Sequence, residues 1–298
     1  MNRMTRDEKK INKIYRRPKE NLYSYRFFQD LSTGFSFTLA EKAFRKDFFS
    51  FEPRNCNVEK LLKSNFNYDT SYSIEQLIER AMYSLMVYGK AYIYIKAGYE
   101  NLSNEQNKAE MRKLSSLEIE EIKGIIKKKT DASMLFISKG FGEKIFERNL
   151  VPKCLVILNI RDLGFREKYF TNLVRKLGKY DITSKITMLS EDKEGYDFSV
   201  HSKRNKRLEL KTIKDVGWSF GTEGLSDSYI LFKKMQMDIL KIKALNYIVN
   251  EINKSLSCIC GEDAGKIVAH VRHIDYDKVW SEYQNGEITV TELTNVLY

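Results

Sequence analysis

The sequence predicts an α+β protein with a helical and mixed N-terminal half and a separate mixed α/β C-terminal half. Two observations indicate this class. Apolar residues form 42% of the 298 residues and aromatic residues 12%, which is enough for a substantial core. Segments with helical spacing of apolar residues also alternate with short runs that have the pattern of strands.

The clearest helix in the N-terminal half is predicted from Ser73. Ser73 and Gln76 have the spacing of a capping box, and apolar residues then recur at helical intervals. Gly89 ends the helix, because glycine adopts the left-handed conformation of a helix C-terminus at little cost. The alternating residues 91–95 then predict a strand. Next come a helix over 115–129 behind the Ser115–Glu118 box, and strands over 134–138 and 154–160.

The C-terminal half is predicted in the order helix, three strands, long helix, strand. The long helix is indicated by an apolar stripe at near-heptad spacing, and Ser226 or Asp227 is a good N-cap for it. The predicted elements are a helix over 162–177, strands near 182–189, 196–201 and 206–213, a helix from 226 to about 255, a strand over 265–271 and two short helices around Asn285-Gly286.

Charge points to a polyanionic partner. The net charge is +11 and the pI about 9.2, so nucleic acid is the first candidate and an anionic membrane surface the second. Genome bias toward lysine is the alternative explanation. Residues 1–20 carry eight cations against three acids, which predicts a basic arm or a frayed first helix; Arg16 and Arg17 are its candidate phosphate contacts.

Composition also limits the compartment. No apolar run is long enough to span a membrane, and the N-terminus lacks the apolar stretch of a secretory signal. Four cysteines are too few for a disulfide scaffold, so we expect reduced thiols and a cytoplasmic protein. Pattern alone suggests four parts: an arm over 1–20, a mixed domain over 21–160, an α/β domain over 161–275 and a helical tail over 276–298.

One constellation in the C-terminal half suggests an enzyme. Asp197 opens one predicted strand, and Glu209 and Lys211 lie two apart on the next, so both would face the same side. Carboxylate oxygens suit Mg²⁺ (or Mn²⁺), which can activate a water against a phosphodiester, while a lysine stabilises the developing charge. A half-buried hairpin with a solvated polar face is the structural alternative.

This motif, with the predicted order αβββαβ, resembles the PD-(D/E)XK nuclease superfamily over roughly residues 160–272, and implies a restriction-endonuclease-like fold. The resemblance makes Asp197 and Glu209 metal ligands, Lys211 the water- or phosphate-positioning cation and Glu167 an accessory carboxylate. The turn between the strands would clamp a DNA backbone with four cations: Lys203, Arg204, Lys206 and Arg207.

A second, partial resemblance is to tailed-phage portal proteins. Residues 83–95 are similar to the helix-to-strand passage of those proteins, and Gly224-Leu-Ser-Asp-Ser-Tyr229 before a long helix is similar to their central segment. A portal chain is typically much longer. This resemblance implies a ring-forming subunit that contacts DNA and needs no catalytic residues.

The sequence therefore leaves three hypotheses. The first is a metal-dependent nuclease of a defence, restriction or mobile-element system, acting on DNA in preference to RNA. The second is a non-enzymatic phage structural protein of portal-like type that forms homo-oligomers and contacts DNA. The third is an interaction module.

Overall fold

The structure, a computed structural model, describes residues 5–15, 22–40, 48–63, 70–102, 111–139, 145–179, 198–221, 225–261 and 265–298. These residues form a mixed α+β protein that contains three small antiparallel sheets. The predicted α+β class is confirmed. The predicted strand near 182–189 lies outside the described residues.

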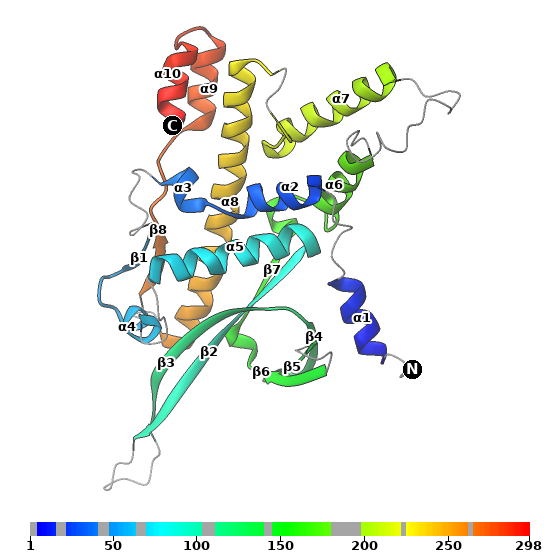
Figure 1. Ribbon diagram of the computed structural model, residues 1–298. Coiled ribbons are helices and arrows are strands. Elements are labelled where there is room, and N and C mark those ends of the chain that lie inside the picture. Colours follow the sequence, from blue (N-terminus) through cyan, green and yellow to red (C-terminus); the bar gives the residue numbers. More distant parts are fainter. Residues whose placement is uncertain are drawn as a thin grey trace.

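The longest helix, α8 (Asp227–Cys260), runs through the centre of the molecule, and helices α2 (Leu22–Ser32) and α5 (Thr70–Tyr88) cross it (Figure 1). Buried side chains follow α8 along most of its length, from Leu231 to Leu256. Burial from several sides explains the long apolar stripe, because a helix covered on more than one face needs apolar residues around it. The predicted long helix is confirmed.

The three-stranded sheet beside α8 has the order β3–β2–β7, with β2 (Lys90–Leu102) between β3 (Met111–Ile122) and β7 (Leu155–Asn159). Helix α5 leads directly into β2 through Gly89, which has a φ of 76°. The predicted helix end at Gly89 and the strands at 91–95 and 154–160 are confirmed. The helix begins at Thr70, before the proposed cap at Ser73.

The other elements surround this centre. Strands β4 (Ile125–Thr130), β5 (Ser133–Lys139) and β6 (Ile145–Leu150) form a second sheet, and β1 (Phe49–Glu52) pairs with β8 (Lys266–Ala269). Helix α1 (Arg6–Ile14) packs on the β4–β5–β6 sheet through Ile11. Short helices complete the fold: α3 (Phe35–Leu39), α4 (Asn57–Lys63), η3 (Pro152–Cys154), and the pair α9 (Tyr276–Gln284) and α10 (Val290–Leu297) that packs on α8.

The prediction of a helix over 115–129 is wrong. These residues belong to β3 and β4, and β3 pairs with β2 from Ile122 back to Met111. The sequence Leu117-Glu-Ile-Glu-Glu-Ile122 fits both periods, since Leu117 and Ile119 alternate with Glu118 and Glu120. Pairing with β2 determines that this segment is a strand, and a local sequence pattern does not reveal such a long-range contact.

The prediction of strands near 196–201 and 206–213 is also wrong within the described residues. Helix α7 (Phe198–Val216) occupies this region, so the αβββαβ order of the nuclease superfamily is not formed there. The buried residues Thr212, Ile213 and Val216 have helical spacing. Leu208, Leu210 and Thr212 also alternate with polar residues, as in a strand, but this pattern does not determine the structure.

The predicted helix over 162–177 is correct in its second part. A 3-10 turn, η4 (Ile160–Leu163), ends at Gly164, and helix α6 (Tyr169–Lys179) follows after a short loop. The principal core continues across position 160: Phe27 and Met82 belong to the same cluster of buried residues as Trp218 and Leu245. All four cysteines are free in the structure.

Candidate nucleic-acid interface

Helix α7 presents a cationic face to solvent. Its 19 residues contain six Lys or Arg against Glu209 and Asp215, a net charge of +4. Five of the cations share one exposed arc of the helix, opposite the buried residues: Lys203, Arg204, Arg207, Lys211 and Lys214. This set is called the α7 arc below. Side chains at these spacings lie on one side of a helix because successive residues turn by about 100°.

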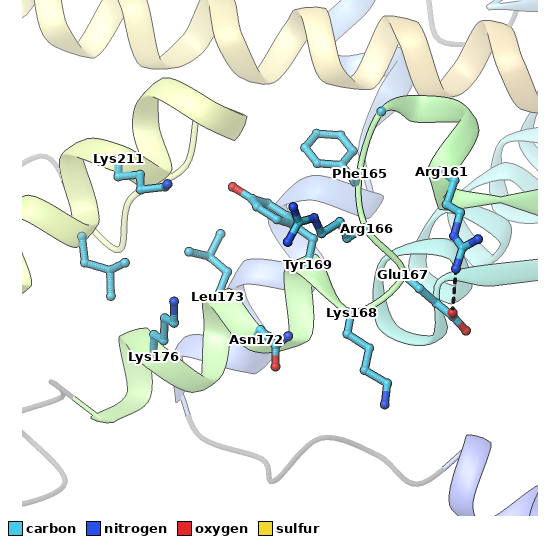
Figure 2. Close-up of a pocket in the computed structure, with 12 residues that line it drawn as sticks. Arg161, Phe165, Arg166, Glu167, Lys168, Tyr169, Asn172, Leu173, Lys176 and Lys211 are labelled. Atoms are coloured by element: carbon cyan, nitrogen blue, oxygen red, sulfur yellow. Dashed lines mark ion pairs between the residues drawn. The ribbon is translucent and has the colours of Figure 1, made fainter.

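A cleft of about 820 Å³ separates α6 from α7 (Figure 2). From α6 it is lined at i, i+3, i+4 and i+7 by Tyr169, Asn172, Leu173 and Lys176. Leu208 and Lys211 line it from α7. Figure 2 shows Lys176 and Lys211 extending from their two helices toward the space between them.

A hydrogen bond joins the two helices that flank the cleft. The Tyr169 hydroxyl donates to Asp215 Oδ2 at 2.6 Å, and Lys211 Nζ lies 3.9 Å from the same oxygen. Burial, and then the hydrogen bond to the Asp215 carboxylate, raise the pKa of Tyr169 well above its ordinary value. Tyr169 therefore stays a neutral donor at physiological pH.

Cations dominate the lining of the cleft. Three of them make no ion pair with any described residue: Arg166, Lys168 and Lys176. Arg161 is paired with Glu167, with 3.6 Å between the guanidinium and the carboxylate (Figure 2). Lys211 shares Asp215 with Tyr169. Unpaired cations around a cleft create a positive potential that attracts polyanions.

The predicted catalytic pair is separated. Glu209 and Lys211 are two positions apart on a helix, which places them about 200° apart around its axis. Lys211 lines the α6–α7 cleft, whereas Glu209 lines a different cavity, of about 510 Å³, together with Arg26 and Lys206. Burial raises the pKa of Glu209, and Lys206 and Lys233 oppose this shift. Asp197 lies outside the described residues.

The described residues around Glu209 do not form a site for a divalent metal. Among the described residues there is no group of three His, Cys, Asp or Glu side chains placed to hold one. The charged groups that act on Glu209 are the cations Lys206 and Lys233. Mg²⁺ requires several oxygen ligands, and neighbouring ammonium groups repel it.

The remaining predicted residues lie as follows. Glu167 is in the loop before α6, not on a helix, and pairs with Arg161. The expected turn that would carry Lys203, Arg204, Lys206 and Arg207 is instead helical; three of these cations belong to the α7 arc, and Lys206 faces the smaller cavity. Arg16 and Arg17 lie outside the described residues.

Sequence reasoning missed the cations of the α6 side. Arg161, Arg166 and Lys168 come from the loop around η4 and Lys176 from α6. Their spacing in the sequence is unremarkable, and only the packing of α6 against α7 places them around one space. The signal in the sequence that could have indicated this face of α6 is the helical spacing of Tyr169, Leu173 and Lys176.

No protein-family model and no curated protein matches the chain. Among the described helices, none combines the length and the apolar character needed to cross a bilayer.

Proposed function

We propose that this protein is a non-enzymatic structural subunit of portal-like type, which forms homo-oligomers and contacts nucleic acid through the α7 arc and the α6–α7 cleft. The observation that carries the proposal is the continuous cationic surface that these two features make. Lys211 belongs to both, so the cations of the arc and of the cleft adjoin each other.

The electrostatic argument concerns phosphate groups. The α7 arc extends from Lys203 to Lys214, about 16 Å at 1.5 Å per residue, which is long enough to meet several successive phosphates of a nucleic-acid backbone. Its side chains are exposed, so they approach phosphates without first losing a buried partner. Such contacts supply affinity and position without reading sequence.

The portal-like part of the proposal is supported by two elements. The sequence that resembles the portal helix-to-strand passage forms such a passage, with α5 ending at Tyr88 and β2 beginning at Lys90. The passage also supports the cleft. Gly89 O accepts a hydrogen bond from Ile160 N at 3.0 Å, and a Cβ on Gly89 would lie 2.6 Å from Glu167 O. The long helix after Ser226 is the second element.

Nucleic-acid binding is tested with a charge-reversal variant and a matched control. The test variant is Lys203→Glu, Arg207→Glu and Lys214→Glu. The control, Lys254→Glu, Lys266→Glu and Lys278→Glu, changes three exposed lysines elsewhere by the same net charge. We expect the test variant to lose at least about tenfold in affinity for duplex DNA and to flatten its salt dependence. Equal losses in both variants would show that net charge alone matters.

Assembly and catalysis are tested separately. Light scattering and electron microscopy are expected to show closed rings of many copies, and a monodisperse monomer would contradict the portal-like proposal. The nuclease hypothesis remains an untested prediction. It requires Mg²⁺-dependent degradation of DNA that Lys211→Ala abolishes without unfolding the protein; we expect no such degradation.

A further inference from the structure

The α6–α7 cleft is lined by apolar side chains as well as by cations, and the apolar part is called its floor below. Four side chains supply this floor: Phe165, Tyr169, Leu173 and Leu208. Binding to phosphate alone requires no such surface, because phosphate contacts are made by cations and hydrogen-bond donors. The floor therefore indicates a ligand with an apolar part as well as charge.

Two aromatic rings of the floor lie close together and are partly exposed. The ring centroids of Phe165 and Tyr169 are 5.2 Å apart, with an angle of 38° between the planes. Phe165 is held from behind by Phe170, at 4.9 Å between centroids, and Phe170 is buried in the core. The rings are thus fixed before any ligand arrives. Fixed aromatic faces next to cations are the feature on which unpaired bases stack in single-strand-binding proteins.

The polar groups around the floor fit the rest of a nucleotide. Arg166 and Lys176 line the cleft without an ion pair to any described residue, and Lys211 adjoins them from α7 (Figure 2). The Asn172 side chain lines the same cleft and makes no hydrogen bond with a described residue. A carboxamide offers both a donor and an acceptor to the edge of a base. At about 820 Å³ the volume of the cleft lies within the range of small-molecule sites, roughly 300–1,000 Å³.

We propose that the α6–α7 cleft binds unpaired nucleotides, in a single strand or at a strand end. The base stacks on Phe165 and Tyr169, and the flanking phosphates contact Arg166, Lys176 and Lys211. A duplex, whose bases are already stacked and paired, contacts only the rim and the α7 arc. This inference rests on the proposed contact with nucleic acid, and it adds the class of nucleic acid that enters this cleft.

The experiment compares a single strand with a duplex of the same length, by fluorescence anisotropy at fixed salt. The variant Phe165→Leu removes the ring and keeps an apolar side chain. We expect it to weaken single-strand binding about five- to tenfold, the loss of one stacked base, and to leave duplex affinity unchanged. Tyr25→Leu, which removes a 68% exposed ring outside the cleft, is the control and is expected to retain single-strand binding. Circular dichroism verifies that both variants are folded.

A second measurement reports the stacking itself. A single strand with one 2-aminopurine loses fluorescence when this base stacks, and wild-type protein is expected to quench it more than Phe165→Leu does. Equal quenching, or an equal loss of single-strand and duplex affinity in Phe165→Leu, would overturn the inference. It would leave the proposed function standing, provided that the α7 arc variant still weakens duplex binding. Absence of binding to either nucleic acid would overturn both.

Discussion

The hydroxyl of Tyr169 on α6 donates a hydrogen bond of 2.6 Å to Asp215 on α7, and this bond fixes the spacing of the two cationic helices. Asp215 Oδ2 also lies 3.9 Å from Lys211 Nζ, and the Lys211 side chain extends toward the cleft (Figure 2). The Asp215 carboxylate therefore contacts residues on both sides of the candidate interface, although its negative charge reduces the positive charge there. Asp215 therefore positions Tyr169 and Lys211 and need not touch a ligand itself.

Removal of this bond is expected to loosen α7. Tyr169→Phe keeps the ring but removes the donor, so the free energy of unfolding should fall by about 1 kcal/mol, as for a hydrogen bond at a partly exposed site. Hydrogen exchange should accelerate in residues 198–216 and not in α8. Tyr25→Phe, at a tyrosine that is 68% exposed, is the control and should change neither. Unchanged exchange in α7 would show that other contacts hold the helix.

Glu209 gives a prediction that separates the two main hypotheses. Burial raises the pKa of its carboxyl, so folding favours the protonated form, and this contribution to stability is lost as the pH rises through the raised pKa. Glu209→Gln replaces the charged form by a neutral side chain of the same shape. We expect the variant to be at least as stable as wild type at pH 7 and to bind DNA equally well. A nuclease that used Glu209 as a metal ligand would instead lose its activity, measured with Mg²⁺ and plasmid DNA.

The contrast between α5 and α7 shows what the sequence alone can predict. Around Gly89, local chemistry decides the structure, because a glycine with positive φ ends a helix whatever packs nearby. In α7, Leu208, Leu210 and Thr212 fit a strand, while Leu208, Thr212 and Val216 fit a helix. The choice depends on the contacts of Ile213 and Val216 with the rest of the molecule, and these are long-range.

The candidate site shows the same limit. The basic character of residues 203–214 was evident from the sequence, and the structure keeps these cations exposed. The secondary structure decided which of them act together. On a strand, Glu209 and Lys211 would share a face, but on a helix Lys211 joins Lys203 and Lys214, and Glu209 turns to another cavity. The predicted strand would place Glu209 and Lys211 on one face, whereas the helix places them on two different faces.

Lys241 gives a prediction about pH. Its side chain is 2% exposed, and Nζ donates to Thr33 O at 2.7 Å. Burial lowers the pKa of Lys241 from 10.5 to about 8, although Asp238 opposes the shift. Between these two values the unfolded chain binds more protons than the folded one, so this group makes the protein more stable as the pH rises.

The comparison of wild type with Lys241→Met isolates this contribution. The free energy of unfolding of wild type, relative to that of the variant, is expected to increase by about 2 kcal/mol between about pH 7.5 and 9.5. Urea denaturation at a series of pH values measures it. Lys254→Met, at an exposed lysine, is the control and should show no such increase. A pH-independent difference would mean that Lys241 keeps an ordinary pKa in the folded protein.

Gly217 directly follows α7, packs against the backbone of α8 and allows a sharp test of the fold. Its φ is 68°, and a Cβ there would lie 2.1 Å from Met237 N and 2.4 Å from Lys233 O, both on the backbone of α8. Gly217→Ala must therefore push α7 and Trp218 away from α8, and we expect a loss of roughly 3 kcal/mol or more in the free energy of unfolding. Gly286→Ala is the matched control, because Gly286 has a similar φ of 76° but nothing within 4 Å of an added Cβ. It should cost only the backbone term, about 1 kcal/mol. Equal costs, measured by denaturant unfolding, would contradict the close packing of α7 on α8 on which the candidate interface depends.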